Sequence, residues 1–231
     1  MPKIKNITFF KAVSTLSQPI ADSTHQIPEI AFIVTRIELD NGVTGDGHLL
    51  AFHYSPQAIL GALRDIAPMA IGCEVSRTGE FLAHHEKESE YFGNVGLHRW
   101  AAGSVNIAMW DAWAKTLGVP VWKMFGVYHD RVPLYGSGGW LSYSNVELLD
   151  EVTRHVKRGF RSVKVKVGSP EIQRDVERLT RGARALPAYQ RGGQRALAAR
   201  GEEARVAGVR RGVPPSFYAH GRGGSRERQI L

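Results

Sequence analysis

The chain has 231 residues, of which 43% are hydrophobic, and a formal net charge of +8. The charge excess lies in the last 51 residues, because residues 1–180 carry 19 Lys and Arg against 19 Asp and Glu. The charge therefore does not indicate that the folded body binds nucleic acid or a membrane. The sequence has no run of about 18 apolar residues, and its one cysteine, Cys73, allows no intramolecular disulfide. We expect a globular cytoplasmic protein without a membrane span or a secretory signal.

The first part of the sequence predicts a three-stranded antiparallel meander. Strands are expected at residues 4–13, 30–39 and 43–50, with a polar, proline-containing segment at 14–28 between the first two. The Asp-Asn-Gly sequence at 40–42 is typical of a hairpin turn, because Asn and Gly tolerate the positive φ that such turns need.

Helical spacing of apolar residues follows from Ser55 onward, with Pro56 allowed in the first turn. A second helix is expected at 79–90. The longest helical pattern runs over 97–118, with Gly118 at its end. Residues 1–126 therefore predict an α+β unit, an antiparallel meander followed by helices.

The order then changes to strand, helix, strand. Residues 132–135 and 161–167 predict strands, residues 145–158 predict the helix between them, and a further helix begins near 169–171. This order and spacing indicate a parallel βαβ unit.

Residues 181–231 have a different composition. Ile, Leu, Val and Phe make up 8 of these 51 residues, which is below the roughly 20% at which packing a core becomes doubtful. Arg, Gly, Ala and Pro predominate. We expect this segment to be disordered, because so little apolar surface does not offset the entropy lost on ordering the chain.

Two lysines on the second parallel strand, Lys164 and Lys166, are the most informative local feature. Side chains at i and i+2 of a strand project from the same face, with their Cα atoms about 7 Å apart. Neighbouring cations lower each other's pKa, so one amine becomes available as a base, suited to removing a proton next to a carboxylate. Alternating Lys and Val also occurs on half-exposed strands, so the motif alone leaves both interpretations open.

Several motifs in order resemble the mandelate racemase/muconate lactonizing group of the enolase superfamily, and most of all its acid-sugar dehydratases of the galactarate/talarate type. They are GVTGDG, SVNIAMWDAWAKTLGVPVWKMFG, RVPLYGSGG and SVKVKVG. The resemblance covers residues 1–180. It implies an N-terminal capping domain at 1–126 and, at 127–180, the first two strands of an incomplete (β/α) TIM-type barrel. It also implies a Mg²⁺ ion that stabilises the anion formed when a carboxylate substrate loses its α-proton.

The resemblance also implies roles for individual residues. Lys166 would be the base that takes the proton, and Lys164 its companion, which keeps the pKa of the base low. Two loops of the capping domain, matching 16–28 and 48–56, would close the site. Candidate substrate contacts in these loops and in the glycine-rich loop near 137 are His25, His53, Tyr54 and Ser137.

The sequence departs from the family after Thr180. The family's three carboxylate metal ligands and its second base, a His paired with an Asp, lie on later barrel strands, and nothing in 181–231 matches them. We therefore expect this chain to bind no Mg²⁺ tightly and to be inactive by itself. The intact family implies a small acid-sugar substrate and a homo-oligomer.

Three interpretations of the last segment stay open. The favoured one is a change of reading frame near Thr180 in a GC-rich gene, which would produce Arg, Gly, Ala and Pro codons. A second is a non-enzymatic capping domain with an RNA-binding tail, because Arg-Gly-Gly occurs at 191–193 and 222–224, although the sparse aromatic residues make nucleic-acid binding the weaker reading. A third is an enzyme whose partner chain completes the barrel.

Overall fold

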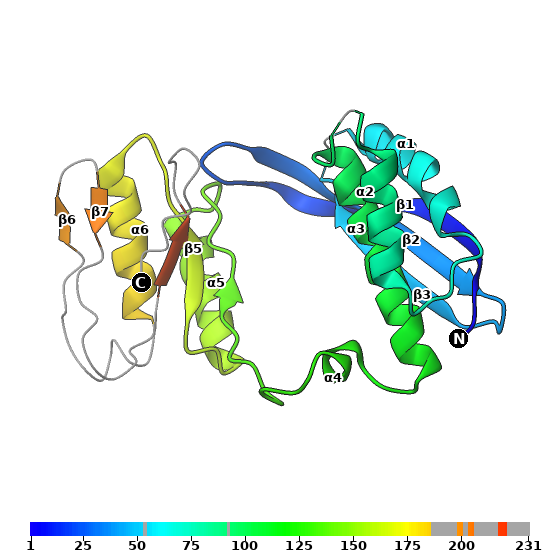
Figure 1. Cartoon of the computed structure of the whole chain (residues 1–231). Coiled ribbons are helices and arrows are strands. Elements are labelled where there is room, and N and C mark those ends of the chain that lie inside the picture. Colours follow the sequence, from blue (N-terminus) through cyan, green and yellow to red (C-terminus); the bar gives the residue numbers. More distant parts are fainter. Residues whose placement is uncertain (53–54, 92, 186–197, 201–202, 206–216, 221–231) are drawn as a thin grey trace. The chain divides into compact units, whose positions relative to one another are not determined.

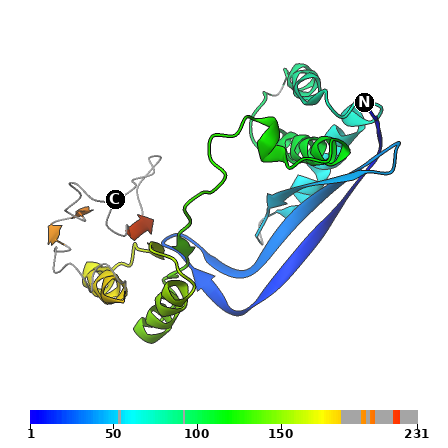
Figure 2. The same ribbon diagram turned by 90° about the horizontal axis from the view of Figure 1, so that it is seen from below.

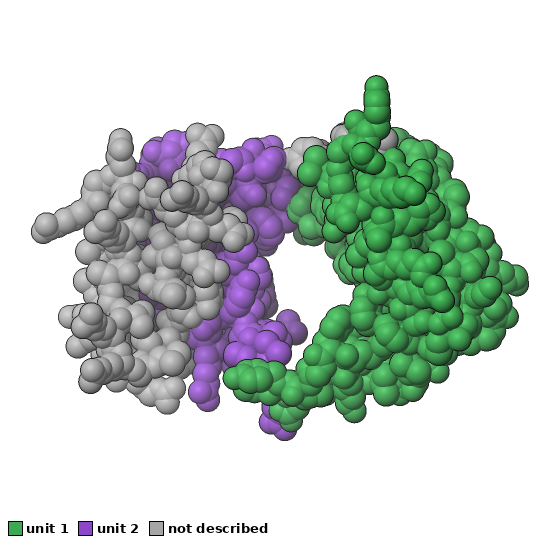
Figure 3. Space-filling model, in the orientation of Figure 1, with its two compact units in different colours: residues 1–17, 28–130 green, residues 18–27, 131–231 purple. Residues whose placement is uncertain are grey.

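Figure 1 shows a computed structural model of the chain, which describes residues 1–52, 55–91, 93–185, 198–200, 203–205 and 217–220. The chain divides into two compact units (Figure 3). Residues 1–17 and 28–130 form the first unit, and residues 18–27 and 131–231 form the second. Each unit has its own cluster of buried apolar side chains. No helix in the described ranges has both the length and the apolar character needed to cross a bilayer.

An antiparallel sheet opens the chain, as expected. Its strands follow the order β1-β2-β3 and are β1 (Ile4–Ala21), β2 (Gln26–Leu39) and β3 (Thr44–Leu50). The expected turn at 40–42 joins β2 to β3, and the Leu39 N–H donates to the Val43 carbonyl at 2.9 Å. In β2, residues 32–38 pair with β3.

The polar segment at 14–28, which was expected to separate the first two strands, instead extends both of them. Residues up to Ala21 continue β1, residues from Gln26 onward continue β2, and the Asp22 N–H donates to the His25 carbonyl at 3.1 Å to close the turn. The prolines are compatible with this hairpin. Pro19 lies on an edge strand, and Pro28 lies outside the part of β2 that pairs with β3.

Helices pack on one face of this sheet (Figures 1 and 2). They are α1 (Pro56–Ile66), the 3₁₀ turn Ala67–Ala70, α2 (Thr78–Glu88) and α3 (Leu97–Thr116). The short α4 (Val121–Met124) follows α3 and buries no residue. The second and third glycines of the GVTGDG motif, Gly45 and Gly47, allow β3 to lie against α3. A Cβ at Gly45 would overlap the Ala108 carbonyl oxygen, and one at Gly47 would overlap the Ser104 carbonyl oxygen.

The second unit contains the βαβ unit that the sequence predicts. Its elements are β4 (Gly136–Ser137), α5 (Asn145–Lys157), β5 (Val163–Lys166), α6 (Ile172–Arg184) and β8 (Phe217–His220). The strands β4, β5 and β8 pair in parallel in that order. Ser144 and Glu147 form a capping box that begins α5.

The first of these strands is shorter and later than expected. Residues 132–135 are not a strand, and the side chains of Val132 and Leu134 are 74% and 71% exposed. The reason is the register of the sheet. Gly136 pairs with Val163, where β5 begins, so residues 132–135 have no neighbouring strand to bind.

Most of the segment 181–231, for which we expected disorder, lies outside the described residues. The described part contains the last turn of α6, the β8 strand, and a short antiparallel pair formed by β6 (Ala198–Arg200) and β7 (Glu203–Arg205). The sequence did not predict β8, so β5 has a parallel neighbour on each side where one was expected.

Candidate active site

Lys166 lies at the end of β5 in a buried position. The alternating valines of the strand, Val163 and Val165, belong to the core of the second unit. Lys164 and Lys166 alternate with these valines and therefore project from the other face of the sheet. Lys164 is partly exposed, but Lys166 has only 8% of its surface exposed. Lys166 is therefore not a solvent-exposed lysine on a half-exposed strand.

The surroundings of Lys166 lower its pKa. Burial is the largest cause, because it disfavours the charged amine. The positive charge of Lys164 and a hydrogen bond with its side chain act in the same direction, and the carboxylate of Asp22 opposes them. A lower pKa raises the fraction of neutral amine near neutral pH, which is the form that can accept a proton.

An aromatic ring also contacts this lysine. The Nζ atom of Lys166 lies 4.9 Å from the centroid of the Trp140 ring. This distance is within the range of a cation–π contact, which favours the ammonium form. The backbone N–H of Lys166 donates to the Gly139 carbonyl at 2.9 Å, so the loop after β4 is joined directly to the end of β5.

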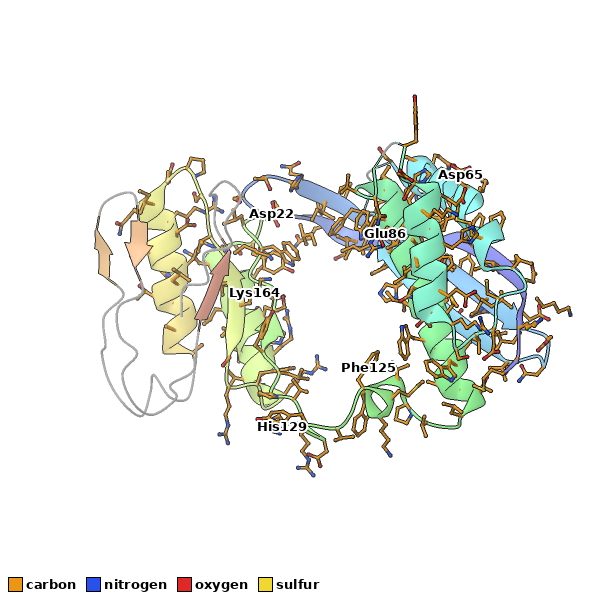
Figure 4. The ribbon with its side chains drawn as sticks, in the orientation of Figure 1. Asp22, Asp65, Glu86, Phe125, His129 and Lys164 are labelled. Carbon is orange, nitrogen blue, oxygen red and sulfur yellow. The ribbon has the colours of Figure 1, made fainter. Side chains whose placement is uncertain are left out.

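The tip of the β1–β2 hairpin, residues 18–27, belongs to the same unit as the lysines. It is attached by a hydrogen bond of 2.8 Å from the Leu141 N–H to the Ala21 carbonyl, and by one of 3.2 Å from the Gln18 amide to Glu147. Figure 4 labels Asp22 on this tip and Lys164 on β5. The tip of the segment 16–28 therefore belongs to the unit that contains the lysines, and its role in closing the site stays a prediction.

Asp22 stays ionised although it is partly buried. Burial raises its pKa, but hydrogen bonds from the backbone N–H groups of Thr24 and His25, both 2.8 Å long, outweigh that effect and leave the pKa below its usual value. The Thr24 hydroxyl donates to the same carboxylate oxygen at 3.1 Å. Asp22 is thus a fixed negative charge whose field acts on Lys166.

Two of the candidate substrate contacts, Ser137 and His25, lie among the described residues of the second unit. Ser137 is exposed and is the Cα partner of Lys164 in the β4–β5 register. His25 lies on the hairpin tip, with its Nδ1 atom 2.7 Å from the Thr24 hydroxyl. His53 and Tyr54 lie outside the described residues.

Sequence reasoning missed two residues that contact or influence Lys166. Trp140 directly follows the Gly-Ser-Gly-Gly loop, so its place after a parallel strand was the available signal. Asp22 begins an Asp-Ser-Thr-His sequence, and Asp with Thr two residues later is typical of a local turn that its side chain stabilises.

The described residues do not fit a Mg²⁺ site. They contain no group of three or more His, Cys, Asp or Glu side chains that could hold a metal ion. Of the carboxylates around the lysine pair, Asp22 binds the N–H groups of its own turn, and Glu151 accepts a hydrogen bond of 2.6 Å from the Gly139 N–H. Magnesium requires several oxygen ligands in near-octahedral geometry, which this arrangement does not offer.

Comparison with known proteins identifies the family. Residues 4–126 match the family described as mandelate racemase / muconate lactonizing enzyme, N-terminal domain. The 3,6-anhydro-alpha-L-galactonate cycloisomerase of Streptomyces coelicolor is 29% identical over 70% of this chain and 45% of the relative. The L-talarate/galactarate dehydratase of Salmonella typhimurium is 27% identical over 80% of this chain and 48% of the relative.

Solved structures agree with these sequence matches. The Salmonella typhimurium L-talarate/galactarate dehydratase, liganded with Mg and L-lyxarohydroxamate, superposes with a TM-score of 0.76 at 26% identity, over 81% of this chain and 50% of that one. The chain thus spans about half the length of the relatives that it matches. Since the family match covers more than half of the chain, this protein belongs to the mandelate racemase/muconate lactonizing enzyme family of the enolase superfamily.

Proposed function

We propose that this chain carries the proton-abstracting part of a Mg²⁺-dependent acid-sugar dehydratase or racemase, with Lys166 as the base. The observation that carries the proposal is the burial of Lys166 at the end of a parallel strand beside Lys164, with a lowered pKa. The names of the relatives support a carboxylate sugar as the substrate class.

Each residue of the site has a distinct task in this proposal. The neutral Nζ of Lys166 accepts the proton from the carbon next to the substrate carboxylate. Lys164 supplies a positive charge near that carboxylate and lowers the pKa of Lys166, so the two lysines divide binding and base catalysis between them. Ser137, opposite Lys164 in the sheet, offers a hydroxyl to the same substrate.

The described residues supply a base but neither a metal site nor a second base. We therefore propose that the chain by itself does not complete the reaction. An experiment that tests Lys166 as the base must add the missing parts. The fold similarity to the Salmonella typhimurium dehydratase allows residues 127–185 to replace the equivalent segment of that enzyme.

The chimera is tested by exchange of the galactarate α-proton in D₂O with Mg²⁺. We expect exchange by the chimera and its loss, by about 100-fold or more, in the Lys166→Ala variant, since a positioned base contributes about 10²–10⁴-fold. Lys157→Ala, an exposed lysine on α5, is the matched control and should exchange at the parent rate. Exchange by the Lys166→Ala chimera at the parent rate would refute the proposal.

The interpretations of residues 181–231 need a separate test, because most of that segment lies outside the described residues. Reading the coding DNA beyond codon 180 in all three frames decides between them. A frame that continues with Asp-x-Asn and Glu-Glu-Pro strand ends supports the change of frame. If no frame does so, RNA binding and barrel completion by a partner chain are to be tested directly.

A further inference from the structure

A buried arginine lies behind the lysine site. Arg178 on α6 has 0% of its surface exposed. Its guanidinium donates to three backbone carbonyls of one loop, at 3.0 Å to Gly139, 2.7 Å to Trp140 and 2.8 Å to Tyr143. Burying a charge costs stability unless hydrogen bonds compensate for it. All of these bonds go to the loop that follows β4, so the charge holds that loop in one conformation.

The Gly139 peptide groups are held from both sides. Glu151 of α5 accepts a hydrogen bond from the Gly139 N–H at 2.6 Å. The Gly139 carbonyl accepts from Arg178 and also from the backbone N–H of Lys166. Two helices and the end of β5 therefore converge on one residue.

The next residue in the chain, Trp140, is held by the same arginine. Arg178 binds the carbonyl on each side of the Trp140 Cα atom, that of Gly139 and that of Trp140 itself. This fixes the backbone from which the indole projects, and the indole lies against the Lys166 amine at 4.9 Å. A ring in this position both covers the amine and favours its protonated form.

We propose that Arg178 and Glu151 are positioning residues, which hold the Gly139 backbone so that the Trp140 ring covers the Nζ atom of Lys166. This inference rests on the proposed function of Lys166 as the base. Among the side chains that the structure describes, the groups that act on this amine are Lys164 from β5, Asp22 from the hairpin tip and the Trp140 ring. The strand β8 adds His220 as the Cα partner of Lys166 in the sheet. The hydrogen bonds that Arg178 and Glu151 make to the loop after β4, called the clamp below, determine whether the Trp140 ring lies over the amine.

The test is NMR of the full chain labelled with lysine carrying ¹³C at Cε. The Lys166 signal is assigned by its loss in Lys166→Met. In the wild type, the Lys166 Hε protons should be shifted upfield by the ring current of Trp140, and Trp140→Leu should abolish that shift. We expect Arg178→Met and Glu151→Met to move the Lys166 signal in the same direction as Trp140→Leu does.

Arg181→Met is the matched control. Arg181 lies on the same helix, is exposed, and pairs with Glu177 at 2.7 Å. Its removal should leave the Lys166 signal unchanged. Because Arg178 is buried, each variant is checked by the methyl signals of Leu148 and Val152, which belong to the core of the second unit. If Arg178→Met loses those signals, Glu151→Met at its partly exposed position decides the question.

The inference is overturned if Trp140→Leu moves the Lys166 signal but Glu151→Met and a folded Arg178→Met leave it in place, or if the wild type shows no upfield shift. Titration of the same signal separates this failure from failure of the proposed function. If the Lys166 pKa is lowered but the ring-current shift is missing, the positioning role of Arg178 and Glu151, the clamp, is overturned, while the role of Lys166 as the base is supported. If the ring-current shift is present but Lys166 has an ordinary lysine pKa, the positioning role is supported, while the role of Lys166 as the base is overturned.

Discussion

Substitution of Gly139 by alanine tests how closely the loop after β4 approaches the strand that carries Lys166. Gly139 has a φ of 61°, and a Cβ added there would lie 2.8 Å from the Val165 Cα. Contacts below 3.0 Å to backbone atoms cannot be relieved by rotating a side chain. The loop or β5 must move, and the hydrogen bond from the Lys166 N–H to the Gly139 carbonyl moves with it.

Two costs add in Gly139→Ala. A non-glycine residue in the left-handed region costs about 1–2 kcal/mol. Forcing extra volume into a packed site costs a further 1–3 kcal/mol or so. We therefore expect the free energy of unfolding of the second unit to fall by about 2–5 kcal/mol.

A second glycine separates these two costs. Gly159, after α5, has a φ of 91°, but a Cβ added there would have no atom within 4 Å. Gly159→Ala should therefore lower the stability by only the backbone cost of about 1–2 kcal/mol. Denaturant unfolding followed at the Leu148 methyl signals reports the second unit. If Gly139→Ala is no more destabilising than Gly159→Ala, the close approach of the loop to β5 is wrong.

Further predictions concern the lysine pair and the first unit. Lys164→Met should raise the pKa of Lys166 and Asp22→Asn should lower it, because the two charges act on the amine in opposite directions; shifts of equal sign in ¹³C titrations would contradict this assignment. Lys166→Met should stabilise the second unit near neutral pH. The folded state holds Lys166 at a lowered pKa, so protonation favours the unfolded chain, and the stability gained by the variant should shrink as the pH rises toward the unfolded-state value of about 10.4. A gain that stays constant with pH would show that better apolar packing of the methionine, and not the removal of the charge, stabilises the variant. Ser104→Ala should lower the stability of the first unit by about 1–3 kcal/mol in denaturant unfolding, because the Ser104 hydroxyl donates to the buried Thr35 hydroxyl at 2.8 Å; no loss would mean that the two hydroxyls are not paired.

The fold could be predicted wherever local pattern and packing agree. The apolar spacing of 97–118 predicts α3, and the motif 40–42 predicts the turn between β2 and β3. The hairpin tip could not be predicted, because its prolines are tolerated only where no third strand pairs, and pairing is a tertiary property. The position of β4 was wrong for a related reason, since the start of β5 determines which residues find a partner.

In the candidate site, too, some features follow from the local sequence pattern and others depend on tertiary packing. Lys164 and Lys166 share a face by the alternation of any strand, so their pairing follows from sequence alone. The burial of Arg178 could not be predicted from the sequence. The stretch around it in α6 also holds Arg174, Glu177 and Arg181, and charges at this spacing are typical of a solvated helix face. Only the packing of α6 against the loop after β4 distinguishes Arg178 from its exposed neighbours.

The central claim is that Lys166 is a buried amine whose proton is held weakly enough for it to act as a base. The most direct measurement is the pH titration of the Lys166 ¹³Cε signal in the folded chain and in the chain unfolded by denaturant. The account predicts a midpoint for Lys166 clearly lower in the folded chain than in the unfolded chain, and a shift upward in folded Lys164→Met. A folded-state midpoint equal to or above the unfolded-state midpoint would contradict the account.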